Sequence, residues 1–210
     1  MNPSDIETIE LLSRAASAQA PRPLFVLLHD AGAAAVDMLE LGHLLGDAFA
    51  ESAVLLPQGL TGSAVNGESL DVLMRRVEAL AGYIRLQQQR LGVLQSDTAL
   101  AGLGAGSTLA LALGSAHDGL VGRVLAFGGG YAAWPTAAPA LTTLHLLHGA
   151  DDKVAPVARI RADFAHLMEL GADATLDVVS AAGHALHPAL MNQAVTRLQT
   201  CVPLRFWKSL

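Results

Sequence analysis

The chain has 210 residues, of which 52% are hydrophobic and 15% are charged. This length is enough for one domain with a substantial core, and the high apolar fraction is typical of strands buried on both faces. A formal net charge of −6 and a sequence pI near 5.7 exclude the basic surface of a nucleic-acid-binding protein. The single cysteine, Cys201, excludes an intrachain disulfide and a thiolate metal cluster.

The amino-terminal segment, residues 1–20, is acidic where a signal peptide would carry positive charge followed by an apolar run. No apolar run in the chain approaches the roughly 20 residues of a membrane span. The sequence therefore predicts a cytoplasmic protein without a transmembrane segment. Ser4 and Glu7 have the spacing of a helix capping box, so we expect a short amphipathic helix through Ala18.

Short apolar runs then alternate with stretches of helical spacing along the rest of the chain. Strands are predicted over residues 24–28, 53–56, 98–101, 121–127, 143–147 and 175–179, and helices over 37–49, 70–91, 106–117, 156–170 and 188–201. This alternation predicts a single domain over residues 1–210, with a mostly parallel sheet of six to seven strands and helices on both faces. Functional loops in such sheets follow the carboxyl ends of the strands.

A glycine-rich turn follows the predicted strand at residues 98–101. Gly102 and Gly106 stand at the outer positions of the nucleophile-elbow pattern G-x-S-x-G, and Gly104 stands at its centre. An acidic pair, Asp151 and Asp152, and then His184 follow in the chain order nucleophile, acid, histidine. Two members of a catalytic triad are thus present in order, while the nucleophile position has no side chain.

These motifs resemble those of the α/β-hydrolases, in particular the small carboxylesterase/phospholipase group that includes the acyl-protein thioesterases. The resemblance rests on five motifs, each after a predicted strand: residues 27–32 (Leu-Leu-His-Asp-Ala-Gly), 56–59 (Leu-Pro-Gln-Gly), the elbow at 102–106, 148–156 (from His-Gly to Pro), and 183–184 (Gly-His). It implies a three-layer α/β-hydrolase fold without a cap domain, acting on carboxylic esters. The eight histidines show no metal-ligand spacing, so we expect neither a metal nor a cofactor.

Carried over residue by residue, the resemblance makes Asp152 the acid and His184 the base. Asp151 is the alternative acid, although Asp152 keeps the family spacing to the motif around it. The family binds the developing oxyanion with two backbone amides, which correspond here to those of Ala31 and Ala105. Backbone donors survive side-chain substitution, so this oxyanion site is expected to persist.

The chain departs from the family pattern at two positions. Asp30 replaces the glycine that follows the histidine of the first loop, and Gly104 replaces the nucleophilic serine. No covalent acyl-enzyme can form on glycine. Two substitutes are conceivable: the hydroxyl of Ser107, which we expect to hydrogen bond at the helix start instead, or a water in the empty serine position activated by His184.

Three further features are open to interpretation. Gly102-x-Gly104 begins a dinucleotide fingerprint, but its sixth position is Ser107 and it follows the third strand, which argues against nucleotide binding. Tyr131 and Trp134 follow the fourth predicted strand and either line a substrate pocket or plug it. The tail at residues 203–210 is aromatic, which indicates a docking edge or a homodimer contact.

Whether the chain is an enzyme is open at this point. The leading hypothesis is a degenerate carboxylic ester hydrolase that binds a small acyl or carbonyl ligand, with weak activity or none. The second hypothesis is an active esterase that uses the His184–Asp152 dyad with a water or with a serine outside the elbow. The third is a protein-interaction module on a hydrolase scaffold.

Overall fold

The computed structural model describes residues 5–12, 23–61 and 69–203. Its centre is a seven-stranded sheet in the order β1-β3-β2-β4-β5-β6-β7. The strands are β1 (Thr8–Leu12), β2 (Leu24–Leu28), β3 (Ala53–Pro57), β4 (Thr98–Leu103), β5 (Arg123–Phe127), β6 (Thr143–Gly149) and β7 (Ala174–Val179). All neighbouring strands are parallel except β1, which is antiparallel to β3.

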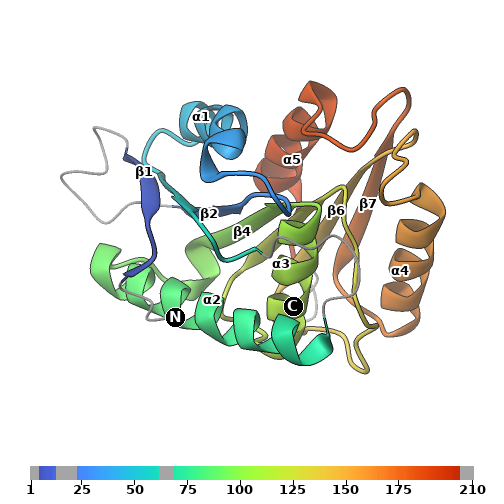
Figure 1. Cartoon of the computed structure of the whole chain (residues 1–210), viewed down its shortest axis with the longest axis horizontal. Helices are drawn as coiled ribbons and strands as arrows, with labels where there is room; N and C mark the ends of the chain where they lie inside the picture. Colours follow the sequence, from blue (N-terminus) through green and yellow to red (C-terminus); the bar gives the residue numbers. More distant parts are fainter. Residues whose placement is uncertain (1–4, 13–22, 62–68, 204–210) are drawn as a thin grey trace.

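Helices cover both faces of this sheet (Figure 1). One face carries α1 (Leu39–Ala48) and α5 (Pro188–Thr200), and the other carries α2 (Leu70–Leu91), α3 (Ala105–Ala116) and α4 (Val157–Glu169). Short 3-10 turns, η2 (Ala35–Met38) and η3 (Gln95–Asp97), precede α1 and β4. The expected three-layer α/β-hydrolase architecture is confirmed, and the described residues contain no cap domain.

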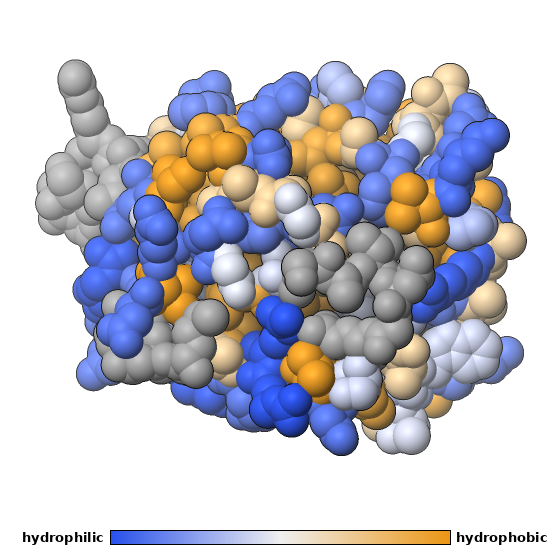
Figure 2. Space-filling view, viewed as in Figure 1, coloured by the Kyte–Doolittle hydropathy of each residue, from blue (hydrophilic) through white to orange (hydrophobic). Residues whose placement is uncertain are grey.

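The strands of the sheet centre are buried on both faces, as their continuous apolar sequences predict. Every residue of β2, β3 and β6 is buried. On the outer surface, the described residues in Figure 2 show apolar side chains in small groups among polar ones. The six strands and five helices expected between residues 24 and 201 are all present, with ends shifted by a few residues.

The helix expected over residues 4–18 is wrong for the part of it that the structure describes. Residues 8–12 form β1, which pairs with β3 from Thr8 opposite Pro57 to Leu12 opposite Ala53. Ile9 and Leu11 pack against the core on one side of this strand, whereas Glu10 bonds to Arg90 on the other. Pairing satisfies the outer edge of β3, which outweighs the local capping signal. Residues 13–22 and the tail from 204 lie outside the described residues.

Candidate active site

The sequence motifs converge where four parallel strands end. The loops after β2, β4, β6 and β7 carry Asp30, Gly104, Asp152 and His184 respectively, and hydrogen bonds or close approaches join all four. Although Asp30 and His184 are 154 positions apart in the sequence, their side chains are in contact. The expectation that these loops meet at the carboxyl edge of the sheet is confirmed.

His184 and Asp152 form a hydrogen-bonded pair. The ring Nδ1 of His184 lies 2.8 Å from Oδ2 of Asp152. The other oxygen of Asp152 accepts hydrogen bonds from the backbone amides of Val154 and Ala155, both at 2.8 Å. Asp152 is almost fully buried while Asp151 is exposed, so the geometry selects Asp152 as the partner of His184.

A second histidine also supports Asp152. His148 is buried, and its Nε2 lies 2.7 Å from the carbonyl oxygen of Ala155 and 3.4 Å from Oδ2 of Asp152. Since a carbonyl only accepts hydrogen bonds, the proton of this ring sits on Nε2. Burial lowers the pKa of His148 and keeps the ring neutral. The sequence alone does not reveal the contact of His148 with Asp152, because this contact depends on the turn between them.

The carboxylate of Asp30 binds the backbone amides of Ala31 and Ala105, the two amides that are expected to bind an oxyanion. We call this pair of amides the cradle. Oδ1 of Asp30 accepts hydrogen bonds from both amides at 2.7 Å. Its Oδ2 lies 3.1 Å from Nε2 of His184. The main-chain oxygen of Asp30 is held in turn by Nδ1 of His29, at 2.8 Å. The sequence marked position 30 only as a departure from the family and gave no sign of where its side chain points.

Asp30 also fills the space that an elbow side chain would need. Gly104 has φ +54° and ψ −112°, a conformation that L side chains rarely adopt. A Cβ added to Gly104 would overlap the Asp30 carboxylate. The Asp30 carboxylate thus lies in the space considered above for a water activated by His184. Its carboxylate and a side chain at position 104 cannot both occupy it.

The hydroxyl of Ser107 is held by the backbone. Ser107 is fully buried, and its Oγ lies 2.5 Å from the carbonyl oxygen of Gly102 and 2.6 Å from that of Phe127, which share its single hydroxyl proton. These bonds tie the first turn of α3 to the ends of β4 and β5. The expectation that Ser107 hydrogen bonds at the helix start is confirmed.

His184 lies between two carboxylates, which sets the charge of the site. Burial alone would lower the pKa of His184, but hydrogen bonds to Asp152 and Asp30 outweigh it and raise the pKa above its ordinary value. Burial would raise the pKa of Asp152, but the amides of Ala155 and Val154 and the ring of His184 lower it overall. These contacts favour the protonated form of His184 over the neutral form that would accept a proton from a nucleophile.

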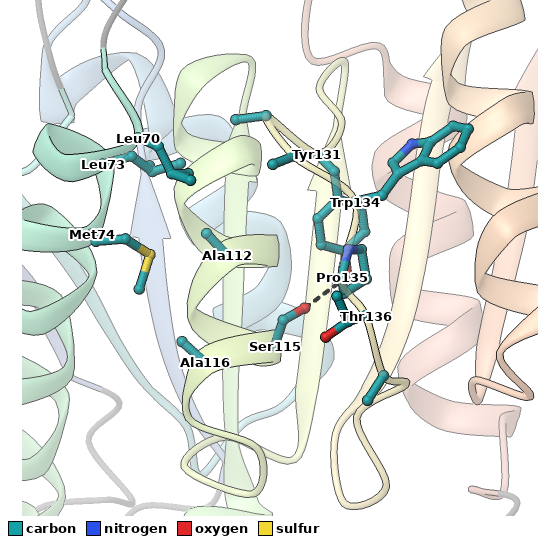
Figure 3. Close-up of a pocket in the computed structure, with 13 residues that line it drawn as sticks. Leu70, Leu73, Met74, Ala112, Ser115, Ala116, Tyr131, Trp134, Pro135 and Thr136 are labelled. Atoms are coloured by element: carbon teal, nitrogen blue, oxygen red, sulfur yellow. Dashed lines mark hydrogen bonds between the residues drawn. The ribbon is translucent and has the colours of Figure 1, made fainter.

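Tyr131 and Trp134 line a cavity of about 390 Å³ (Figure 3). Its walls come from the start of α2, the second half of α3 and the loop after β5: Leu70, Leu73, Met74, Ala112, Ser115, Ala116 and residues 131–137. The Tyr131 hydroxyl is 3.2 Å from that of Ser115, and burial raises the pKa of Tyr131 to about 12, so this phenol is neutral. Asp30, Gly104, Asp152 and His184 are not among the lining residues.

Helix α4 holds the cavity wall in place. The buried carboxylate of Asp163 accepts from the Tyr131 amide at 3.0 Å and from Nε1 of Trp134 at 2.7 Å. The indole of Trp134 turns toward α4 and stacks on His166 with ring centroids 4.6 Å apart. Tyr131 and Trp134 therefore belong to a cavity wall that contacts with α4 hold in place.

The described residues hold neither a metal-binding cluster nor a membrane-spanning helix. No group of three or more His, Cys, Asp or Glu side chains there has a metal-binding arrangement. Across the same ranges, every helix is too short or too polar to cross a membrane.

The fold and this convergence of loops define an α/β-hydrolase, and comparison with known proteins identifies the family. Residues 62–202 match the family model described as Phospholipase/Carboxylesterase. Esterase YpfH of Escherichia coli (strain K12) is 32% identical over 197 residues, which cover 88% of this chain and 85% of that protein. The chain therefore belongs to the phospholipase/carboxylesterase family.

Solved structures agree on the fold. The crystal structure of esterase PE8 superposes with a TM-score of 0.80 at 21% identity, covering 94% of this chain and 99% of the other. The Bacillus cereus carboxylesterase also gives a TM-score of 0.80, at 16% identity, with 95% and 96% coverage. Nearly the whole of each esterase is thus represented in this chain.

Proposed function

We propose that this family member does not hydrolyse carboxylic esters through a serine acyl-enzyme, and that it binds an uncharged carbonyl or acyl ligand. The observation that carries the proposal is the Asp30 carboxylate, which takes both amides of the cradle and the Nε2 of His184. In this proposal Asp152 and His184 are the remaining dyad, the amides of Ala31 and Ala105 are the oxyanion donors, and Gly104 stands at the nucleophile position.

Ester hydrolysis through a serine requires a nucleophilic hydroxyl, a neutral histidine and two free backbone amides for the oxyanion. The contacts at this site oppose all three requirements. A nucleophilic hydroxyl is absent at Gly104, and the Ser107 hydroxyl is bonded to two carbonyls. A neutral His184 is disfavoured by its two carboxylate partners. An ester carbonyl would have to displace a charged acceptor from the two amides, and hydrogen bonds to charged groups are about twice as strong as neutral ones.

The main alternative, hydrolysis by a water activated at His184, requires Asp30 to leave the cradle first. The interaction-module alternative expects a filled pocket, and the open cavity beside Tyr131 favours ligand binding over it. The single domain, the cytoplasmic location and the homodimer contact of the tail remain predictions.

We expect that the native chain neither reacts with a serine-hydrolase probe nor hydrolyses a serine-hydrolase substrate. A fluorophosphonate probe should leave the intact protein mass unchanged, and p-nitrophenyl butyrate should be hydrolysed no faster than by unfolded chain at equal concentration. A family esterase that carries the elbow serine provides the positive control. Labelling of any serine of this chain by the probe, mapped by peptide mass spectrometry, would refute the proposal.

We expect the ligand to bind in the cavity between α2, α3 and the loop after β5. Its apolar walls suit an alkyl chain, and the neutral hydroxyl of Tyr131 can donate to a ligand carbonyl. Filling it by Ala112→Phe should weaken binding of 2-octanone, measured by Trp fluorescence or calorimetry, by at least about tenfold.

The control for this binding experiment is Leu94→Ala, which removes an exposed apolar side chain away from the cavity. This variant should bind 2-octanone like the native chain. Octanoate, which carries a negative charge, should bind more weakly than the ketone because burying a carboxylate beside neutral hydroxyls is unfavourable. Equal binding by the native chain and Ala112→Phe would exclude this cavity as the ligand site.

A further inference from the structure

The contacts of Asp30 are those that an ester would make at this site. In an acyl-enzyme, the ester carbonyl oxygen accepts from the two amides and the other ester oxygen faces the catalytic histidine. Here Oδ1 accepts from the amides of Ala31 and Ala105, and Oδ2 faces Nε2 of His184 at 3.1 Å. The Cγ atom of Asp30 between them is therefore in the position of the carbonyl carbon that such a site hydrolyses.

We infer that Asp30 is a nucleophile in its own right and that this chain hydrolyses epoxides to vicinal diols through an ester formed on Asp30. This goes beyond the ligand binding proposed above, because it assigns a different chemistry to the carboxylate that blocks ester turnover. Carboxylates of Asp and Glu serve as covalent nucleophiles in several enzyme classes. The side chains of Asp30 and His184 are 25% and 15% exposed, so a small molecule in solution can reach both.

The chemistry of a carboxylate selects the substrate class. Attack of Asp30 on an ester carbonyl would produce a mixed anhydride, which is higher in energy than the ester that was broken. Attack on a saturated carbon instead produces an ordinary ester. An epoxide has such a carbon, it is uncharged, and opening its strained ring keeps the leaving oxygen attached to the product.

In the first step, Oδ2 of Asp30 forms a bond to an epoxide carbon while the ring carbon–oxygen bond breaks. The released oxygen takes the proton from Nε2 of His184, whose pKa the hydrogen bonds to its two carboxylate partners raise. The products of this step are a hydroxyalkyl ester on Asp30 and a neutral His184. The histidine has thereby become the base that the next step requires.

In the second step, water adds to Cγ of Asp30 as Nε2 of His184 takes one of its protons. The negative charge develops on Oδ1, which the two amides already hold at 2.7 Å. Collapse breaks the bond between Cγ and Oδ2, and the departing diol oxygen takes the proton of the new carboxyl group. The sum is one epoxide plus one water to one diol, with Asp30 ionised and His184 protonated again.

The glycine at position 104 is required by this chemistry. A side chain there would overlap the carboxylate of Asp30 and displace it from the amides. The two departures from the family pattern, Asp30 and Gly104, thus form one arrangement, with the nucleophile moved from the elbow to the neighbouring loop.

The test uses the full native chain, styrene oxide and ¹⁸O-labelled water, with enzyme in excess over epoxide so that each site turns over once. The diol should carry unlabelled oxygen, and the label should appear in the carboxylate of Asp30 by peptide mass spectrometry. In His184→Gln, which removes the acid of the first step and the base of the second, diol formation should fall to the rate in buffer. Asp30→Asn should lower the rate of diol formation by at least about 10³-fold.

The matched control is Asp37→Asn, which alters an exposed carboxylate a few residues from Asp30 and should keep the native rate. A native rate of diol formation equal to that in buffer would overturn the inference, as would a native rate in Asp30→Asn. The inference would also be overturned if, after one turnover, ¹⁸O appeared in the diol and not in the carboxylate of Asp30. Water would then have attacked the epoxide directly. Fluorophosphonate labelling tests the absence of serine chemistry separately, so the two proposals can fail independently.

Discussion

The double variant Asp30→Gly/Gly104→Ser is expected to hydrolyse p-nitrophenyl butyrate at least about 10²-fold faster than the native chain. Removing Asp30 frees the amides of Ala31 and Ala105 and the Nε2 of His184. Adding the hydroxyl places a nucleophile on the elbow, whose φ of +54° and ψ of −112° are already set in this chain. The initial rate and fluorophosphonate labelling at position 104 measure the outcome.

Neither single substitution should reproduce this gain. Gly104→Ser alone places a Cβ against the Asp30 carboxylate, so either the turn or Asp30 must move. Asp30→Gly alone clears the cradle but supplies no nucleophile. The two effects are therefore strongly non-additive, as expected for side chains that compete for one space. A Gly104→Ser variant as active as the double variant would show that Asp30 does not obstruct the elbow.

The pH profile of the double variant tests the charge assignment. Asp30 is one of the two carboxylates that raise the pKa of His184, so its removal should lower that pKa. Activity should rise with pH through the lowered value, because only the neutral ring accepts the serine proton. Adding Asp152→Asn should remove the gain, whereas Asp151→Asn, which changes the exposed neighbour, should preserve it.

Much of this architecture could be predicted from sequence because its signals are local. Short, mainly apolar runs predicted β2 to β7, and the family resemblance favoured Asp152 over Asp151 as the partner of His184. The helix predicted for the amino-terminal segment was wrong because the capping box on which it rested is also a local signal. The stability of β1 comes instead from pairing with β3, which lies more than 40 residues away.

The arrangement of side chains in the site depends on contacts between residues that are far apart in the sequence. No local sequence pattern predicts such contacts. The bond from the Ala105 amide to Asp30 spans 75 positions, and that from Asp30 to His184 spans 154. The sequence shows Asp30 and Gly104 only as two separate departures from the pattern of the family that it resembles. Only their spatial overlap shows that one substitution makes room for the other.

Gly102→Ala is expected to destabilise the chain by about 3 kcal/mol or more, although alanine is among the mildest possible changes. A Cβ on Gly102 would overlap the backbone carbonyl of Gly106 at the start of α3. Gly102 is also fixed between β2 and β5, opposite Leu28 and Ala126 in the sheet. Neither backbone can move without breaking the registers that place the elbow. The midpoint of urea unfolding, at an unchanged m-value, measures the loss.

The matched control is Gly46→Ala in α1, where an added Cβ would have no atom within 4 Å. Alanine favours helix over glycine, so this variant should be more stable than the native chain by about 0.5–1 kcal/mol. The two substitutions should change the free energy of unfolding in opposite directions. This difference distinguishes a close backbone approach at Gly102 from a general effect of replacing glycine. If Gly102→Ala unfolded at the native midpoint, the close approach of β4 to the first turn of α3 would be incorrect. The placement of the Ala105 amide in the cradle would then fail with it, since α3 begins at that residue.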